Sequence, residues 1–318
     1  MGAPAPLVGI PEAPIPAGGQ AEWFTGAGGV RLRAALFPAQ GDARGSVVLS
    51  PGRTEPIEKY FETIGDLTGR GLQVLVHDWR GQGLSQRLLP DRLRGHAVSF
   101  EDFLADHRAL LDAFETRLTP PLIGLGHSMG GGLVLLALVR GETRLAAAVL
   151  SAPMLAISTR PWPGAVAAAA ARLLGALGRA GDYALPAYDP LTNRFGADLL
   201  TRDMRRYDLF KAQLRACPDL ALGALTWGWL NFAFRSAAAL LAPGALEQVQ
   251  TPVTIVAAGH ERLVINAASR AAARRLPHGR YIEIPDARHE LLMETDDKRN
   301  AFWRAFDEAA AEVTSPRG

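Results

Sequence analysis

The chain has 318 residues, of which 48% are hydrophobic and 21% charged, so one large α/β domain with an insertion is expected. The formal net charge is only +2 and no basic stripe dominates, which argues against nucleic acid as a partner. The single cysteine, Cys217, excludes an internal disulfide and favours a reducing compartment, so a cytoplasmic location is predicted.

Residues 1–20 carry five prolines and lack both the basic and the apolar region of a secretory signal. They are therefore predicted to form an extended arm on the surface. The most apolar later stretch, 164–178, is too short to span a bilayer and contains Arg172. It is predicted to be a helix, and no transmembrane segment is expected.

Strand and helix patterns alternate from residue 21 onward. A β-hairpin is predicted over 21–38. Buried strands are predicted at 46–52, 72–79, 121–126, 145–153, 252–259 and 279–287. Helices are predicted at 56–71, 99–118, 129–141, 266–276 and near 297–312. This alternation is typical of a mostly parallel sheet that is covered by helices.

Residues 155–245 interrupt the alternation, because they are rich in Ala, Trp and Phe and contain no convincing strand. The segment follows one strand and precedes the next, so it is predicted to form a helical cap over the carboxyl ends of the strands. Open α/β sheets bind their ligands at that edge. The predicted organisation is an arm over 1–20, a core over 21–154 and 246–318, and a cap over 155–245.

The segment Gly126-His127-Ser128-Met129-Gly130 places a serine between glycines where a predicted strand meets a predicted helix. A G-x-S-x-G pattern in this context is typical of a nucleophile elbow. The sharp turn strains the backbone of the serine, so the positions two residues away must be small, and Gly126 and Gly130 meet that need. Ser128 is therefore the candidate nucleophile, and an ordinary turn of small residues is the alternative.

A serine hydroxyl needs a base to take its proton, and the base needs a carboxylate to orient it. In this architecture the acid and then the histidine follow the serine. His289, after the last predicted strand, is the candidate base, because His278 lies at the opposite edge and His127 is expected to point away along the elbow. Glu261, in the loop after strand 252–259, is the favoured acid, and Asp286 is its competitor.

An oxyanion hole needs two N–H donors that are already in position. One is expected from Met129, the residue after the nucleophile, and the other from the loop after an earlier strand. In that loop Gly52 permits a tight turn, so the Arg53 N–H is the second candidate. The Arg53 side chain has two possible roles, as a surface charge or as a contact to an anionic head group.

Together, the motifs resemble a known family. "SPGRTEPIEKY", "HDWRGQGLS", "GHSMGG", "SAPM", "ERLV" and "RHELL" occur in the order seen in α/β-hydrolase-fold lipid hydrolases. They are most similar to the bacterial lysophospholipase and monoacylglycerol-lipase branch, also described as serine-aminopeptidase-like hydrolases. The resemblance covers about residues 21–312 and implies the α/β-hydrolase fold. It maps the nucleophile to Ser128, the acid to Glu261, the base to His289 and the oxyanion donors to Arg53 and Met129.

Two positions depart from the common pattern of that family. Pro51-Gly52 stands where His-Gly is common, and Glu261 stands where Asp is commoner. Asp78, in "HDWRGQG", belongs to the structural pattern of the family, so it is expected to support the fold rather than the chemistry.

If residues 155–245 form a cap, their surface selects the substrate. Aromatic residues of this segment are candidates for an acyl-chain tunnel or, equally, for helix packing: Trp162, Trp227, Trp229, Phe232 and Phe234. The segment has ten Lys and Arg against six Asp and Glu, a net +4. A basic, apolar cap would suit an anionic lipid surface, so peripheral contact with the inner membrane face is a further hypothesis.

The leading hypothesis is a serine hydrolase that cleaves carboxylic esters of a lipid, a lysophospholipid or a monoacylglycerol, through an acyl-enzyme. Two other hypotheses stay open. One is an esterase or aminopeptidase acting on a small acyl substrate, and the other is a non-catalytic binding protein with this fold. No metal and no nucleotide cofactor is expected, since the sequence has no metal-ligand, Rossmann or P-loop motif. The sequence leaves the oligomeric state open.

Overall fold

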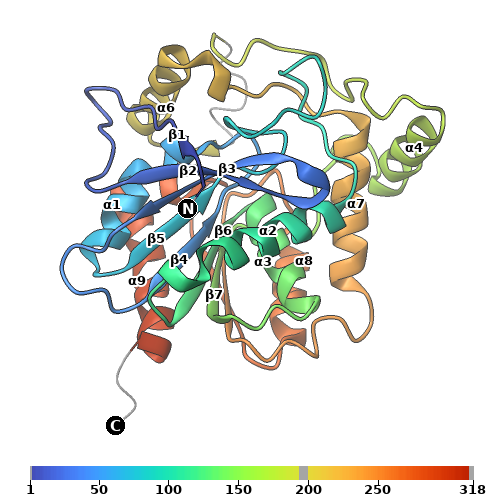
Figure 1. The fold of residues 1–318 in the computed structure, drawn as a ribbon. Coiled ribbons are helices and arrows are strands. Elements are labelled where there is room, and N and C mark those ends of the chain that lie inside the picture. Colours follow the sequence, from blue (N-terminus) through green and yellow to red (C-terminus); the bar gives the residue numbers. More distant parts are fainter. Residues whose placement is uncertain (1, 193–199, 315–318) are drawn as a thin grey trace.

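The computed structural model describes residues 2–192 and 200–314. Over these residues one sheet has the spatial strand order β1-β2-β3-β5-β4-β6-β7-β8-β9 (Figure 1). The strands are β1 Pro4–Ala5, β2 Gln20–Thr25, β3 Arg31–Phe37, β4 Ser46–Ser50, β5 Gln73–His77, β6 Leu122–His127, β7 Leu145–Ser151, β8 Val253–Ala258 and β9 Gly279–Ile284.

Strands β4 to β9 are parallel to one another, whereas β1, β2 and β3 add antiparallel neighbours at one edge. Ser50 of β4 pairs with Gly126 of β6, and His127 of β6 pairs with Ser151 of β7. These neighbouring strands therefore end at the same level. Strands β4, β6 and β8 are buried along their whole length, as expected for parallel strands with helices on both faces.

The helices cover both faces of the sheet. Helices α1 (Phe61–Gly69) and α9 (Asp296–Thr314) pack on one face, where their apolar side chains share a core cluster with the sheet. The other face is covered by α2 (Phe100–Phe114), α3 (Met129–Val139), α7 (Trp227–Leu241) and α8 (Asn266–Arg275). A mostly parallel sheet flanked by helices is the predicted fold class, and β2 and β3 form the predicted hairpin.

The N-terminal residues are fastened to the sheet rather than only lying along the surface. Strand β1 pairs with β2, and the Pro6 carbonyl accepts a hydrogen bond from Nη1 of Arg33 at 2.9 Å. The Val8 N–H donates to the Glu58 carboxylate at 3.2 Å. The prolines explain the extended path, but these backbone contacts depend on partners that are distant in the sequence.

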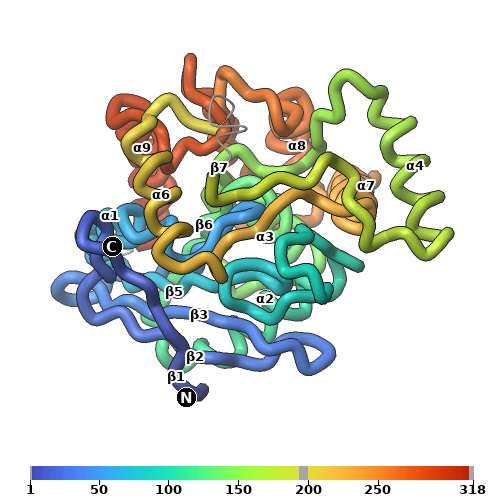
Figure 2. Tube along the Cα trace, turned by 90° about the horizontal axis from the view of Figure 1, so that it is seen from above, coloured from blue at the N-terminus to red at the C-terminus, as the bar shows by residue number. Residues whose placement is uncertain are grey.

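The described part of 155–245 contributes helices α4 (Gly164–Ala176), α6 (Met204–Ala216) and α7, and none of it forms a sheet strand. Figure 2 shows α6 over the sheet and α4 projecting at the periphery. Helix α7 packs against α3 and α4, and its Phe232 is fully buried in the main core cluster. This end of the segment is therefore continuous with the helix layer of the core.

A buried ionic cluster fixes the strand edge next to the site. The Arg33 guanidinium bonds the Glu58 carboxylate at 2.7 and 2.8 Å and Asp78 at 2.8 Å, and all three side chains are fully buried. Asp78 also accepts from the N–H groups of Ile57 and Leu84. Asp78 thus ties β3 to the loops after β4 and β5, which is the structural role predicted for it.

Candidate active site

Ser128 lies in the turn between β6 and α3. Its φ is 49° and its ψ is −115°, a conformation that residues with a side chain rarely adopt. Its N–H donates to the Ser151 carbonyl at 2.9 Å, and its own carbonyl accepts from Gly132 and Met154. These backbone bonds hold the strained turn in place, so the hydroxyl stands at the carboxyl edge of the sheet.

Gly126 and Gly130 occupy positions with no room for a side chain. A β-carbon at Gly126 would stand 2.6 Å from the Cα of Gly131. A β-carbon at Gly130 would stand 2.1 Å from the carbonyl oxygen of Ser50. Because both obstacles are backbone atoms, α3 can approach β4 and β6 this closely only with glycine at these positions.

The structure brings Ser128, His289 and Glu261 into one hydrogen-bonded chain. The Nε2 atom of His289 lies 2.8 Å from the Ser128 hydroxyl, and its Nδ1 lies 2.7 Å from Oε2 of Glu261. The histidine and glutamate side chains are both buried. The three residues follow β6, β9 and β8, so the parallel sheet delivers them to one edge.

Glu261 is held on both of its oxygens. Its Oε1 accepts hydrogen bonds from three successive backbone N–H groups, those of Arg262, Leu263 and Val264, at 2.7–3.2 Å. This leaves Oε2 for His289. The longer glutamate side chain therefore reaches the histidine at hydrogen-bond distance in a position where aspartate is commoner in the family.

Charge coupling tunes the pKa of both groups. Burial, the largest single influence, favours the neutral imidazole, but the carboxylates of Glu261, Glu290 and Glu55 together outweigh it and raise the pKa of His289, with Glu261 acting most strongly of the three. Burial also opposes ionisation of Glu261, but His289 and the backbone N–H groups lower the pKa of Glu261. Glu261 is thus ionised at neutral pH and stabilises a protonated His289.

The competing residues lie elsewhere. Asp286 is an exposed turn residue with φ of 58°, and its nearest recorded charged partner is His260 at 4.0 Å. The His127 ring bonds the carbonyl and hydroxyl of Ser151 at 3.1 Å, away from the Ser128 hydroxyl. It is nevertheless not remote, since its ring packs 5.0 Å from that of His289. Burial lowers the pKa of His127 to about 4, so this second imidazole is neutral at physiological pH.

The two candidate oxyanion donors lie at adjacent strand ends. Met129 is the first residue of α3, so its N–H belongs to the helical turn that has no intrahelical acceptor. Over the described residues, no backbone or side-chain acceptor is recorded for the Arg53 N–H. The Pro51 carbonyl accepts from Nε1 of Trp79 at 2.8 Å, and the Gly52 N–H donates to Glu55 at 2.6 Å, which fixes the loop between them.

Sequence reasoning missed a buried network behind the histidine. Lys59 bridges Glu55 and Glu290 at 2.6 Å each, and Glu55 also accepts from Gly52. Burial opposes ionisation of Glu55, but Lys59 and His127 bring its pKa down to about 2. The network links the loop of Arg53 to the loop of the histidine. The only signal in the sequence is the spacing of four residues between Glu55 and Lys59.

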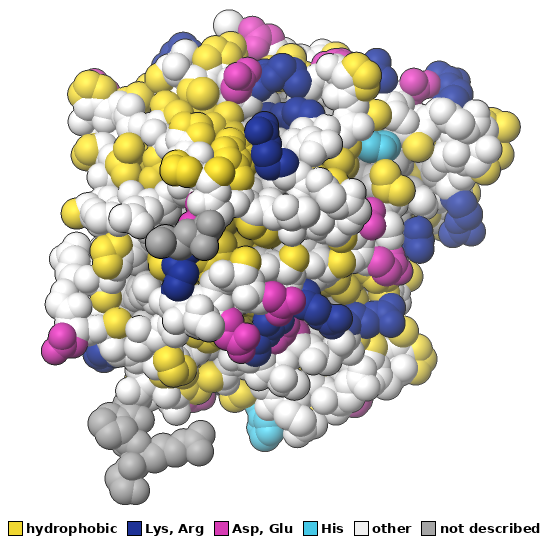
Figure 3. All heavy atoms as spheres, in the orientation of Figure 1, with side chains coloured by type: hydrophobic (Ala, Val, Ile, Leu, Met, Phe, Trp, Pro, Cys, Tyr) yellow, Lys and Arg dark blue, Asp and Glu magenta, His cyan; other side chains and the backbone are white. Residues whose placement is uncertain are grey.

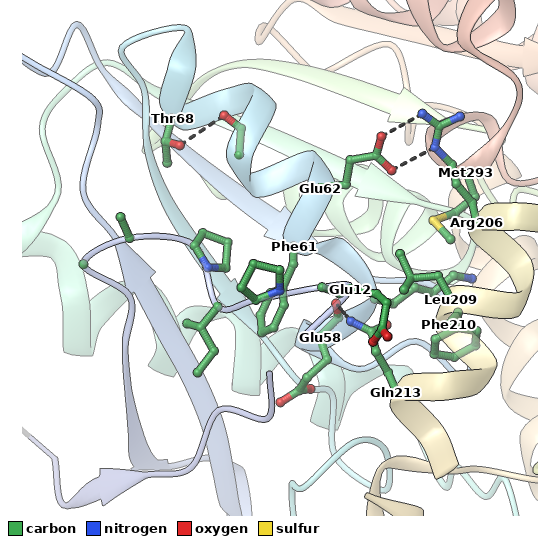
Figure 4. A pocket seen from close by; sticks show the side chains of 18 of the residues that line it. Glu12, Glu58, Phe61, Glu62, Thr68, Arg206, Leu209, Phe210, Gln213 and Met293 are labelled. Atoms are coloured by element: carbon green, nitrogen blue, oxygen red, sulfur yellow. Dashed lines mark hydrogen bonds and ion pairs between the residues drawn. The ribbon is translucent and has the colours of Figure 1, made fainter. Parts of the chain in front are cut away.

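A separate cleft of about 720 Å³ lies between the N-terminal segment, α1 and α6 (Figure 4). No residue of the Ser128 chain lines it, and its Glu62 is paired with Arg206 at 2.7 Å. Over residues 2–192 and 200–314, no group of three or more His, Cys, Asp or Glu is placed to hold a metal ion. In the same residues, no helix combines the length and apolarity needed to cross a membrane.

Comparison with known proteins places the chain in a family. The model of the family described as Serine aminopeptidase, S33 matches residues 41–296. The chain belongs to this family. It is 32% identical over 308 residues to Lysophospholipase L2 of Escherichia coli, covering 93% of this chain and 88% of the relative. It is 30% identical over 278 residues to Monoacylglycerol lipase of Mycolicibacterium smegmatis, covering 86% and 91%.

Solved structures show the same fold. A soluble variant of monoglyceride lipase from Saccharomyces cerevisiae, in complex with a substrate analogue, superposes with a TM-score of 0.75 at 20% identity. The match covers 98% of this chain and all of that one. A carboxyl esterase from Bacillus coagulans has a TM-score of 0.74 at 15% identity, covering 93% and 99%. The family model and the two sequence relatives confirm the predicted resemblance to the lysophospholipase and monoacylglycerol-lipase family.

Proposed function

We propose that this chain is a carboxylic-ester hydrolase that cleaves a lysophospholipid or a monoacylglycerol through an acyl-enzyme on Ser128. The single observation that carries the proposal is the chain of hydrogen bonds from Glu261 through His289 to a strained, half-buried serine. A strained serine, an imidazole whose pKa is raised and an ionised acid are the parts that nucleophilic acyl transfer needs. The curated relatives, a lysophospholipase and a monoacylglycerol lipase, support a lipid ester.

Each residue has one role in the proposed mechanism. Ser128 attacks the ester carbonyl while Nε2 of His289 takes its proton, and Glu261 stabilises the imidazolium. The N–H groups of Arg53 and Met129 bind the oxyanion. The imidazolium then protonates the leaving alcohol, and a water activated by His289 releases the fatty acid from Ser128.

The test compares fatty-acid release from lysophosphatidylcholine, monoacylglycerol and a short-chain nitrophenyl ester. We expect at least one lipid to be hydrolysed, and Ser128→Ala to abolish the activity. Ser50→Ala is a matched control, because Ser50 ends the adjacent parallel strand and is buried against His77. Hydrolysis of the short ester alone would refute the lipid proposal and favour the esterase alternative. Cleavage of an aminoacyl nitroanilide would favour the aminopeptidase.

We propose further that α4 contacts a lipid surface. Four large apolar residues in and next to α4 have 52–68% of their surface exposed: Trp162, Val166, Leu173 and Leu177. The exposed arginines Arg160, before α4, and Arg172, within it, supply positive charge, whereas Arg179 is paired with Asp182 at 2.7 Å. Figure 3 shows apolar and basic side chains together on the edge where Figure 1 places α4. An exposed apolar helix face with basic flanks suits an anionic interface.

Two of the aromatic residues predicted as candidates for an acyl-chain tunnel do not lie where a tunnel lining would lie. Trp162 is 68% exposed and faces outward, so its place is the proposed lipid-contacting surface and not an enclosed tunnel. Phe232 is fully buried and packs 4.9 Å from Phe103, which is core packing.

Vesicle flotation tests the surface. We expect the protein to float with anionic vesicles more than with neutral ones, and Leu173→Ser with Leu177→Ser to weaken the binding. The control is Ile15→Ser, an exposed apolar residue in the cleft of Figure 4. Equal flotation with anionic and neutral vesicles would refute the electrostatic part, and unchanged binding of the double variant would refute the role of α4.

A further inference from the structure

The Arg53 side chain leaves the candidate oxyanion loop and enters the space beneath the inserted segment. Its Nη2 donates a hydrogen bond to the Gly223 carbonyl. Its Cζ lies 5.4 Å from the centre of the Trp229 ring at the start of α7. The guanidinium also packs against Gly95, where an added β-carbon would stand 2.3 Å from Nη2. One residue therefore reaches from the reacting centre to the segment that is expected to select the substrate.

Two buried donors in this place have no partner among the residues that the structure describes. The Nε of Arg53 and the Nε1 of Trp229, whose ring covers the guanidinium, are both buried and make no hydrogen bond with any of these residues. In residues 2–192 and 200–314 no carboxylate pairs with Arg53, and the Tyr188 phenol is its side-chain hydrogen-bond partner. Burial lowers the pKa of Arg53. A buried donor without an acceptor is costly and needs an explanation, and a ligand oxygen supplies one.

Other buried arginines of the chain are satisfied. Arg33 is saturated by Glu58 and Asp78, and Arg206 by Glu62, Asp203 and Asp296. Arg87 is the nearest match to Arg53, because it also joins the core to the segment before α7. Its two Nη atoms donate to four backbone carbonyls, those of Gly81, Gly83, Asp219 and Ala221. The unpartnered Nε of Arg53 is thus not a general property of arginines beneath this segment.

We propose that the Arg53 guanidinium binds the phosphodiester of a lysophospholipid head group and makes lysophospholipids better substrates than neutral monoacylglycerols. This inference rests on the proposed function. In a lysophospholipid the glycerol backbone separates the ester carbonyl from the phosphate by a few bonds. In Arg53 the side chain likewise separates the backbone N–H from the guanidinium by a few bonds. One residue can thus hold the oxyanion with its N–H and the phosphate with its Nε.

The Arg53 guanidinium and a phosphodiester match in charge and in hydrogen-bonding groups. A phosphodiester is anionic across the physiological pH range, and its oxygens accept charge-assisted hydrogen bonds from a guanidinium fork. A monoacylglycerol offers only hydroxyl groups at the same distance from the ester. It gains less from the buried charge, so the contact discriminates between the two lipids.

The test measures kcat/KM on lysophosphatidylcholine and on monoacylglycerol with the same acyl chain. We expect Arg53→Met to lower the ratio of the two constants at least tenfold, mainly through a higher KM for the phospholipid. Arg53→Lys keeps the positive charge but loses the forked guanidinium, so its ratio of kcat/KM values should lie between those of the wild type and Arg53→Met. The matched control, Arg87→Met, removes a link to the same segment and should leave the ratio unchanged.

The outcomes separate this inference from the proposed function. If the wild type hydrolyses neither lipid, the proposed function fails. If it hydrolyses lipid and Arg53→Met lowers both constants by the same factor, Arg53 is only a structural link and the inference is wrong.

Soluble inhibitors distinguish the source of the phosphate. Glycerophosphocholine should inhibit monoacylglycerol hydrolysis by the wild type and should do so less in Arg53→Met. Inhibition by inorganic phosphate alone, without inhibition by glycerophosphocholine, would contradict a head-group site.

Discussion

Two buried polar clusters lie at different strands of the same sheet and are built in opposite ways. In the cluster of Arg33, Glu58 and Asp78, the side-chain donors of the arginine meet carboxylates or a carbonyl, so the cluster is closed. The chain from Glu261 through His289 is closed at the glutamate and ends on the half-buried hydroxyl of Ser128. A saturated cluster holds segments together, whereas a cluster with an open end can act on a further molecule.

The largest expected effect is a loss of activity when Glu261 of the open-ended cluster is changed. In Glu261→Gln, three backbone N–H groups require an acceptor, so the amide oxygen takes the place of Oε1 and the amide NH2 faces Nδ1 of His289. This favours the wrong imidazole tautomer, and we expect kcat to fall by about 10³–10⁴-fold. Steady-state kinetics measures the loss. Glu283→Gln, an exposed glutamate on β9 paired with Arg270, is the control and should keep nearly full activity.

The closed cluster should respond in stability instead. Asp78→Asn removes one carboxylate from the buried Arg33, and we expect the free energy of unfolding to fall by about 3–5 kcal/mol. Denaturant unfolding measures this change. Asp307→Asn removes a half-exposed partner of Arg70 and should cost no more than about 1 kcal/mol. A loss of activity in Asp78→Asn without a loss of stability would overturn the structural role of Asp78.

The smallest effect is a change in pH dependence. His289 acts as a base only when neutral, and Glu261 raises its pKa above the ordinary 6.5, so kcat/KM should fall as the pH drops through a value above 6.5. In Glu261→Gln, burial still lowers the pKa of His289 while the strongest raising charge is gone, and only the smaller effects of Glu290 and Glu55 remain. The acidic limb should then move to lower pH. A limb that stays in place would mean that Glu261 does not set the pKa of His289.

Much of the site followed from the order of motifs along the chain. Parallel strands end at one edge, so a serine after β6, an acid after β8 and a histidine after β9 had to come close together. Gly126 and Gly130 could be foreseen because a sharp strand-to-helix turn excludes side chains, and the contacts give the physical reason.

Other features depend on partners that sequence spacing does not reveal. Lys59 meets Glu290 across 231 positions, so only tertiary packing shows that this network lies behind His289. The direction of the Arg53 side chain, left open by the sequence, depends on Gly223 and Trp229 of the inserted segment. The N-terminal residues were expected to form a surface arm, and their pairing with β2 rests on edge hydrogen bonds that carry no sequence signature.

The central claim is that His289 activates Ser128, and labelling by a fluorophosphonate tests it most directly. Peptide mass spectrometry of the labelled protein should place the adduct on Ser128, and His289→Ala should slow labelling by orders of magnitude while the protein remains folded. Folded wild type that does not react, or that reacts at another serine, would contradict the account and favour a non-catalytic binding protein with this fold.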